Sequence, residues 1–313
     1  MTAIRIEKLT KIYGPVRALD GLDLAVEENS IFGFLGPNGA GKTTTIRLLT
    51  GLAHPTAGQA WVAGTPIGSD HQAARIIGYL PEEPAFYTYL SPLEYLDHIG
   101  RLFHLPSAER RKRIDDLLEL TGLAGVKKRR IGGFSRGMRQ RLGLAQALIN
   151  RPQVLLLDEP VSALDPIGRK EILDLIERLR GQCTIFMSTH ILADVERVCD
   201  SVGIIHKGRL LVKSNKNELL ERYALPVLEL ECDQSQAPVL TAWLPELSAQ
   251  TWVKSTSIDQ NVARIIVTDI ETDRARLLAA VLQAGLPLRR FEVVTPSLED
   301  VFLRLVNAAE EKS

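Results

Sequence analysis

The sequence predicts an α/β fold built on a parallel sheet, followed by a smaller α+β domain. An apolar run at residues 31–35 is typical of a buried strand, and it leads through a glycine-rich loop into a helix. Two further apolar runs, Val154–Leu157 and Thr184–Met187, are separated by a predicted helix, which is the pattern of a βαβ unit with buried parallel strands. Near Pro226 the pattern changes to shorter strands and helices, which indicates a second domain.

The composition is that of a globular protein without a charge bias. The 313 residues include 38 Lys plus Arg and 38 Asp plus Glu, so the chain lacks the basic excess typical of nucleic-acid binding. Its three cysteines, Cys183, Cys199 and Cys232, do not have the spacing of metal ligands, which favours a reducing intracellular compartment. No apolar run approaches the roughly 18 residues of a membrane span, so we expect any spans to come from another chain.

The first half of the chain begins with short β segments and then becomes helical. We expect strands at four places: 4–9, 22–26, 30–34 and 59–62. The helix after the glycine-rich loop is expected over 44–50. The run Ser91-Pro92-Leu93-Glu94 offers a helix cap, a first-turn proline and a capping-box glutamate. A further helix is expected from Ser107, with Leu117 and Leu118 on its apolar face.

The second half contains a predicted helix over 169–180, a predicted hairpin and then the smaller domain. The hairpin pairs Val202–Ile205 with Arg209–Val212. We expect one domain over 1–224 and a second over 225–313. The elements expected in the second domain are strands at 227–231 and 262–268, a helix at 273–284, a strand at 291–294 and a helix at 297–306.

The glycine-rich loop has the pattern of a phosphate-binding site. The run Gly36-Pro37-Asn38-Gly39-Ala40-Gly41-Lys42-Thr43 matches G-x-x-x-x-G-K-[ST] between a predicted strand and a predicted helix. Glycines let several backbone N–H groups converge on an anion, and the helix N-terminus adds its positive end. We expect Lys42 to bridge the terminal phosphates of a nucleotide and the Thr43 hydroxyl to hold Mg²⁺.

Three more candidate residues follow predicted parallel strands. Asp158 and Glu159 come directly after the strand at 154–157, and His190 comes after the strand that begins at Thr184. Ligands collect at the carboxyl ends of parallel strands, so these side chains should meet the glycine-rich loop. We expect Asp158 to hold Mg²⁺, Glu159 to accept a proton from the attacking water, and His190 to contact the terminal phosphate.

Taken together, these motifs resemble the ATP-binding subunit of an ABC transporter. The run Phe134-Ser135-Arg136-Gly137-Met138 resembles the ABC signature in the variant of the ABC-2-type and drug-exporter branch. Ser162-Ala163-Leu164-Asp165 matches the D-loop, His190 the switch histidine, and Tyr13 the aromatic residue that stacks on adenine. The resemblance implies an ABC ATPase core, with an antiparallel β subdomain and a helical subdomain at about 85–150.

The resemblance also assigns roles to residues. It implies catalytic roles for Lys42, Glu159 and His190, and Mg²⁺ ligation by Thr43, Asp158 and Glu82. The nucleotide contacts that it implies are Tyr13, Gly36, Pro37, Asn38, Gly39, Ala40, Gly41, Lys42, Thr43, Thr44, Ser135, Gly137 and Asp165. Ser135 is a predicted helix cap, so its helix N-terminus is an anion site, and in this family that site faces the ATP of a second subunit.

The resemblance further implies an assembly and a location. Two such chains form a dimer around two ATP molecules with Mg²⁺, and the dimer drives a separate membrane permease, in this branch as an exporter. The protein would then be peripheral to the cytoplasmic face of the cell membrane, with no nucleic-acid partner. The alternative is a non-transport ABC ATPase that acts on nucleic acid or ribosomes. The basic stretch Lys127–Arg130 suggests that alternative, but the balanced charge and the lack of interleaved aromatic residues favour a solvated face.

Two residues depart from the family pattern. Glu82 stands where most members have the glutamine of the Q-loop, and a carboxylate can bind Mg²⁺ but cannot donate a hydrogen bond to water. Arg136 replaces a signature glycine and is expected to point to solvent.

The C-terminal segment has an apolar stripe with two possible roles. The run from Thr295 to Leu303 resembles the C-terminal motif of drug-resistance-type ABC ATPases. Within the predicted last helix, Leu298, Val301, Phe302 and Leu305 lie on one face. This face either packs in the core of the smaller domain or contacts a second chain.

Overall fold

The computed structural model describes residues 1–68, 72–162, 164–223, 226–294 and 297–310 of the chain. They form two compact units, Met1–Lys216 with Val306–Ser313 and Asn217–Leu305. The boundary expected between residues 224 and 225 lies outside the described residues, as do Ala163 of the expected D-loop and Thr295 and Pro296 of the expected C-terminal motif. Within the ranges that are described, no helix is long and apolar enough to cross a membrane.

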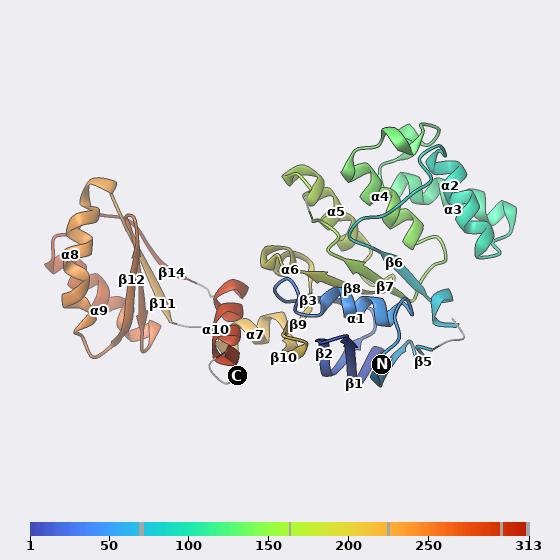
Figure 1. The fold of residues 1–313 in the computed structure, drawn as a ribbon. Helices are drawn as coiled ribbons and strands as arrows, with labels where there is room; N and C mark the ends of the chain where they lie inside the picture. Colours follow the sequence, from blue (N-terminus) through green and yellow to red (C-terminus); the bar gives the residue numbers. More distant parts are fainter. Residues whose placement is uncertain (69–71, 163, 224–225, 295–296, 311–313) are drawn as a thin grey trace. The chain divides into compact units, whose positions relative to one another are not determined.

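A six-stranded sheet forms the centre of the larger unit, in the order β10-β9-β3-β8-β7-β6 (Figure 1). Its strands are β3 (Ile31–Leu35), β6 (Ile77–Leu80), β7 (Val154–Asp158), β8 (Thr184–Thr189), β9 (Ser201–His206) and β10 (Arg209–Asn215). Neighbours pair in parallel, except that β10 is antiparallel to β9, as expected for the hairpin. The carboxyl ends of β3, β6, β7 and β8 therefore share one edge of the sheet.

The core strands are buried along their whole length, which explains their continuous apolar runs in the sequence. Every residue of β3, β7 and β8 is buried. Phe186 stacks against Phe32 with ring centroids 5.5 Å apart, and it lies 5.2 Å from the ring of Phe34. This packing fixes the strand ends that carry the candidate residues. The predicted α/β fold with a parallel sheet is confirmed.

A second, antiparallel sheet in the same unit has the order β2-β1-β4-β5. Its strands are β1 (Thr2–Tyr13), β2 (Val16–Glu27), β4 (Ala57–Val62) and β5 (Thr65–Pro66). The first two strands are much longer than the segments expected at 4–9 and 22–26. Register shifts along the β1–β2 pair, one of them between Ile6 and Leu9 where Lys8 has φ of 46°, let the strands continue past residues that suggested their ends.

The helices of this part of the chain agree with the sequence expectations, except for the last two, which were not predicted. They are α1 (Lys42–Leu49), α2 (Pro92–Leu102), α3 (Ser107–Leu120), α4 (Arg136–Ala147), α5 (Pro166–Arg178), α6 (Leu192–Val198) and α7 (Lys216–Tyr223). The capping box of α2 is confirmed, because the Ser91 hydroxyl accepts from the Glu94 N–H and the Glu94 carboxylate accepts from the Ser91 N–H. Figure 1 shows α2, α3 and α4 grouped together beside β6.

The smaller unit is a four-stranded antiparallel sheet with α8 and α9 on one face (Figure 1). Its elements are β11 (Val227–Cys232), α8 (Ala237–Ser248), β12 (Val253–Asp259), β13 (Val262–Val267), α9 (Ile270–Gln283) and β14 (Leu288–Val294), and the strand order is β12-β13-β11-β14. Leu230 and Ile265 from the sheet pack in one core with Leu244 and Leu277 from the helices. On the other face, Glu229 pairs with Arg264 and Arg290.

Two elements of this unit were missed by the sequence analysis. The helix α8 contains Pro245 in its interior, and an internal proline argues against a helix. The strand β12 has mostly polar residues, and Val253 is its single buried position. The last helix, α10 (Leu298–Glu310), is capped as expected by Ser297.

Leu298 and Val301 of the α10 stripe are buried within the single chain, whereas Phe302 and Leu305 are half-buried.

Candidate nucleotide-binding site

The glycine-rich loop joins β3 to α1 and is tightly packed. A Cβ atom on Gly36 would lie 2.5 Å from the carbonyl oxygen of Ile205, and one on Gly41 would lie 2.7 Å from that of Ala18. Gly41 also has φ of 112°, in the region that favours glycine. The helix begins at Lys42, two residues earlier than the expected start at 44, because this glycine forms its N-cap. The first-turn N–H groups of α1 therefore border the loop.

The Lys42 side chain contacts the backbone of the glycine-rich loop that precedes it. Its ammonium group is buried, donates to the carbonyl oxygens of Gly36 at 2.7 Å and Pro37 at 3.3 Å, and lies 3.3 Å from a carboxylate oxygen of Glu159. The expectation that Lys42 belongs to a phosphate-binding loop agrees with this position. A bound triphosphate would compete with the Glu159 carboxylate for the same ammonium group.

Asp158 lies at the carboxyl end of β7, beside the first turn of α1. Its Oδ1 atom accepts hydrogen bonds from the hydroxyl groups of Thr43 at 3.1 Å and Ser188 at 2.7 Å. Burial raises the pKa of this carboxyl, the nearby Glu159 and Glu82 carboxylates raise it further, and the two hydroxyl donors oppose the shift. A cation at this position would remove the cost of keeping the carboxylate ionised.

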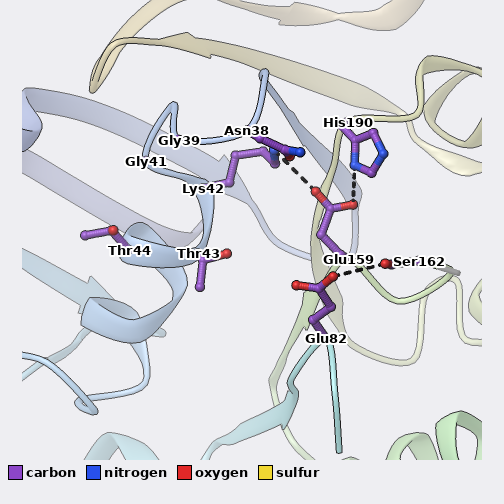
Figure 2. A pocket seen from close by; sticks show the side chains of 10 residues that line it. All are labelled: Asn38, Gly39, Gly41, Lys42, Thr43, Thr44, Glu82, Glu159, Ser162 and His190. Carbon is purple, nitrogen blue, oxygen red and sulfur yellow. Dashed lines mark hydrogen bonds and ion pairs between the residues drawn. The ribbon is translucent and has the colours of Figure 1, made fainter.

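Glu159 is shared between two basic side chains (Figure 2). One carboxylate oxygen faces Lys42, and the other lies 2.9 Å from Nδ1 of His190. The Glu159 backbone has φ of 47°, and its N–H donates to the carbonyl oxygen and to the hydroxyl of Ser188. This left-handed backbone turns the Glu159 side chain away from the direction of Asp158, as expected from the sequence for a residue with a different role.

Lys42, Glu159 and His190 line a cavity of about 400 Å³, whereas Asp158 is not among its lining residues. The lining residues are Asn38, Gly39, Gly41, Lys42, Thr43, Thr44, Glu82, Glu159, Ser162 and His190. Glu82 follows β6 and accepts a hydrogen bond from the Ser162 hydroxyl at 3.0 Å (Figure 2).

Two residues near this cavity were not singled out by the sequence analysis. The sequence places Ser162 in the D-loop but predicts no contact for it in this cavity, and it predicts no role for Ser188. A signal was present for both, since each lies within three residues of Glu159 or His190.

Four candidate residues away from the glycine-rich loop and β7 are not part of this cavity lining. Tyr13 is half-exposed near the end of β1, with the Lys11 ammonium group 4.7 Å from the centre of its ring. Asp165 caps α5 by accepting from the Gly168 N–H. Ser135 caps α4 as expected, by accepting from the Met138 N–H at 3.2 Å.

The fourth of these residues, Gly137, has open space around it. No atom lies within 4 Å of a Cβ built on Gly137. Arg136 is exposed, as expected, and its guanidinium lies 3.7 Å from the Glu83 carboxylate.

The oxygen atoms beside α1 suit Mg²⁺. Thr43, Asp158 and Glu82 offer hydroxyl and carboxylate oxygens, the donors that this hard cation prefers. In the described part of the chain, no group of three or more His, Cys, Asp or Glu residues is placed to hold a metal. Mg²⁺ commonly takes only one or two carboxylates from a protein, with phosphates and water as its other ligands.

Comparisons with known proteins agree with this geometry. Residues 19–162 match the family model described as ABC transporter, and residues 215–306 match the one described as ATP-binding protein DrrA1-3-like, C-terminal domain. The chain is 41% identical over 305 residues to YxlF, an uncharacterized ABC transporter ATP-binding protein of Bacillus subtilis, covering 97% of this chain and 100% of YxlF. It is 37% identical over 309 residues to the bacitracin transport ATP-binding protein BcrA of Bacillus licheniformis, covering 97% of each.

A solved structure gives the same result. The structure of an ATP-binding subunit of an ABC transporter aligns with a TM-score of 0.65 and 30% identity, covering 71% of this chain and 93% of that one. The predicted ABC ATPase core is confirmed, and the chain belongs to the family of ABC transporter ATP-binding subunits, which are ATPases.

Proposed function

We propose that this ATPase works as a dimer that closes around two ATP molecules and drives a separate membrane permease in the direction of export. The observation that carries the proposal is the separation of two anion sites within the larger unit. Lys42 and the N-terminus of α1 line the cavity, whereas Ser135 and Gly137 at the N-terminus of α4 do not belong to it. Each ATP would then lie between Lys42 of one chain and Ser135 and Gly137 of the other.

In this proposal, the cavity residues divide the work of hydrolysis. Lys42 and the N–H groups of Gly36 to Thr44 hold the phosphates, and Thr43, Asp158 and Glu82 hold Mg²⁺. Mg²⁺ would neutralise charge that develops on the phosphate oxygens. Glu159 accepts the proton of the attacking water, and His190, which already contacts the Glu159 carboxylate, faces the terminal phosphate.

Tyr13 and Asp165 are proposed to act at the rim of the site. The Tyr13 ring is exposed enough to stack on adenine, and Lys11 beside it adds a positive charge. Asp165 ends the D-loop at the start of α5 and would border the second chain.

ATP binding would change the contacts of Glu159. In the structure, Lys42 lies 3.3 Å from the carboxylate that we propose as the base. A triphosphate carries more charge than one carboxylate, so it would draw the ammonium group toward itself. Glu159 would then keep its contact with His190 and be free to accept a proton from water.

The segment from Glu82 to Leu90 is proposed as the surface that meets the permease. Tyr87 and Tyr89 are 53% and 66% exposed there, which is unusual for large aromatic residues. Their rings lie 5.9 Å apart, and Tyr87 also packs against Tyr95 and His98 of α2. Two exposed aromatic rings on a supported loop are suited to bind another protein.

We infer export from the cytoplasmic face of the membrane, and the names of the matched proteins support the transport role. BcrA is a bacitracin transport protein, and the matched C-terminal model is that of the DrrA proteins. The nucleic-acid alternative has less support. Within the basic stretch, Lys127 pairs with Asp115 at 2.8 Å and Arg129 donates to the Gly133 carbonyl, so part of its positive charge is already satisfied.

The test is the oligomeric state of Glu159→Gln in the presence of ATP. The amide cannot accept the proton of water, so hydrolysis should fall by about 100-fold or more while ATP stays bound. The variant should sediment as a dimer with ATP and as a monomer without it, whereas the wild-type chain should show only a transient dimer. A Glu159→Gln chain that binds ATP tightly and stays monomeric would contradict the proposal.

A further inference from the structure

A single hydrogen bond joins two loops of the cavity that come from distant parts of the sequence. Glu82 lies in the loop after β6, and Ser162 lies in the loop after Glu159, 80 residues later. The Ser162 hydroxyl donates to Oε1 of Glu82 at 3.0 Å, and both residues line the cavity. Figure 2 shows the Glu82 carboxylate joined to the Ser162 hydroxyl by a dashed line, below Glu159 and His190 in this view.

The position of Ser162 is fixed relative to Glu159. The Ser162 N–H donates to the Glu159 carbonyl oxygen at 3.0 Å, and the Glu159 N–H donates in turn to the Ser188 carbonyl oxygen at the end of β8. The hydroxyl of Ser162 is therefore anchored through a turn to the end of the central sheet. The Ser162 hydroxyl can therefore donate a hydrogen bond from a fixed position in the cavity lining.

Glu82 has much less support of its own. Glu82 is exposed. In the part of the chain that the structure describes, no lysine, arginine or histidine forms an ion pair with it. The carboxylates of Asp158 and Glu159 lie at the same edge of the sheet, and their charges favour turning Glu82 out to solvent. The Ser162 hydroxyl is the contact that opposes this tendency.

We propose that Ser162 is a positioning residue that holds the Glu82 carboxylate in the cavity for Mg²⁺. The hydroxyl fixes the carboxylate through Oε1, while Oε2 and the second lone pair of Oε1 stay able to bind the cation that accompanies the nucleotide. This inference rests on the proposed Mg²⁺–ATP site. It gives a reason why glutamate serves at a position where glutamine is usual, because an oriented carboxylate presents a second oxygen to the cation and glutamine would present an NH₂ group.

The experiment measures how much Mg²⁺ strengthens nucleotide binding to the full chain. The affinity for a fluorescent ATP analogue is measured in excess Mg²⁺ and in EDTA, and the ratio of the two affinities is compared between variants. Ser162→Ala should lower the affinity in Mg²⁺ about tenfold, since a hydrogen bond to a charged group is lost. Its affinity in EDTA should stay within about twofold of wild type, because Ser162 acts on the cation and not on the phosphates.

Three further variants decide whether Ser162 acts through Glu82. Ser162→Thr keeps the hydroxyl and should therefore have the wild-type ratio of the affinities in Mg²⁺ and in EDTA. Glu82→Gln should lower the ratio by itself, and adding Ser162→Ala to it should then have no further effect. Ser30→Ala is the matched control, because this hydroxyl donates to the Glu27 carbonyl oxygen just before β3, at the other end of the strand.

The outcomes separate this inference from the proposed function. Equal losses in Mg²⁺ and EDTA, or an additive loss in the Glu82→Gln background, would show that Ser162 acts independently of Glu82 and would overturn the inference. A wild-type chain that does not bind the analogue in either condition would instead overturn the proposed site. If Ser162→Ala does not fold, Ser162→Gly in the wild-type and Glu82→Gln backgrounds makes the same decision, because it also removes the hydroxyl and its effect should also disappear without the carboxylate.

Discussion

The two anion sites of the larger unit are built in opposite ways. At the α1 site, Lys42 and Glu159 are buried, and each has partners within the chain. At the α4 site, Ser135 is exposed and satisfies only its own helix, while Gly137 faces open space. The first site is organised by the fold of one chain. The second is an exposed helix N-terminus, as we expect for a surface that another molecule completes.

The same difference is visible in the glycines. Gly36 and Gly41 are required by atoms of this chain, because a Cβ on either would meet a carbonyl oxygen of Ile205 or Ala18. Gly137 is not required by any atom within 4 Å. We infer that Gly137 serves the close approach of the nucleotide held by the second chain, as proposed above.

The largest expected effect comes from blocking the α4 site with a charge. Gly137→Asp should leave the fold intact, because there is space for the side chain and an acidic residue is favourable in the first turn of a helix. The carboxylate would repel the phosphates held by the partner chain, so ATP hydrolysis should fall about 100-fold. Steady-state hydrolysis and binding of a fluorescent ATP analogue measure the two effects separately.

Wild-type turnover in Gly137→Asp would contradict this expectation. Such a result would mean that the N-terminus of α4 never meets a nucleotide. An unchanged circular dichroism spectrum is the control for folding. Loss of analogue binding to the isolated chain would also contradict the expectation, because the α1 site is complete without Gly137.

A smaller effect is expected when the α1 site loses its cation. Lys42→Ala should weaken ATP binding by about tenfold or more, because a charge-assisted contact to phosphate is lost. Isothermal titration calorimetry gives the affinity directly. Lys128→Ala removes an exposed lysine of the same unit and should bind ATP normally. Equal affinities for Lys42→Ala and Lys128→Ala would refute the assignment of this lysine.

The glycines give a matched pair of stability predictions. Gly41→Ala should lower the free energy of unfolding by about 3 kcal/mol, because it combines a φ of 112° with a clash at the Ala18 carbonyl. Gly137→Ala should raise it by up to about 1 kcal/mol, because alanine favours the helix and meets no atom. Urea unfolding followed by circular dichroism measures both, and effects of the same sign would contradict the distinction.

The smallest effect concerns the buried carboxyl at the cavity. In Asp158→Asn the amide oxygen would still accept from Thr43 and Ser188 without carrying a charge, so the nucleotide-free chain should gain about 1 kcal/mol of stability at neutral pH. The raised pKa of Asp158 means that the folded chain binds the proton more tightly than the unfolded chain. Stability should therefore fall as the pH rises from the ordinary value of 3.8 through the raised value, and the variant should lack this dependence.

Thermal unfolding of the nucleotide-free protein between acidic and neutral pH checks this prediction. A variant that is less stable than wild type at neutral pH would show that the Asp158 carboxylate is compensated in the free protein, and would contradict the expected cost.

Much of the fold was readable because its signals are local. The capping box at Ser91 and the buried runs of β7 and β8 depend on neighbours in the sequence, and the structure confirms them. The strand β12 was missed because an exposed strand needs few apolar residues, and α8 was missed because it contains Pro245. Pairing in a sheet stabilises β12 from a distance, which a local pattern does not report.

For the candidate site too, the sequence predicts residues in local motifs but not the contacts between distant segments. The residues of the α1 loop and the strand ends were found from their motifs, and the structure brings Lys42, Glu159 and His190 together. The hydrogen bonds from Ser188 to Asp158 and from Ser162 to Glu82 were not found. Both join residues at least 30 positions apart, so they depend on the strand order and not on spacing in the sequence.

Subunit complementation tests most directly whether two chains share each nucleotide. Lys42→Ala lacks the α1 half of each site, and Gly137→Asp lacks the α4 half, so each protein alone should hydrolyse ATP poorly. In a mixed dimer, one of the two sites combines an intact Lys42 with an intact Gly137. The mixture should therefore regain about a quarter of wild-type activity if half of the dimers are mixed and the sites act independently. A mixture no more active than the separate variants would contradict the claim that two chains share each nucleotide.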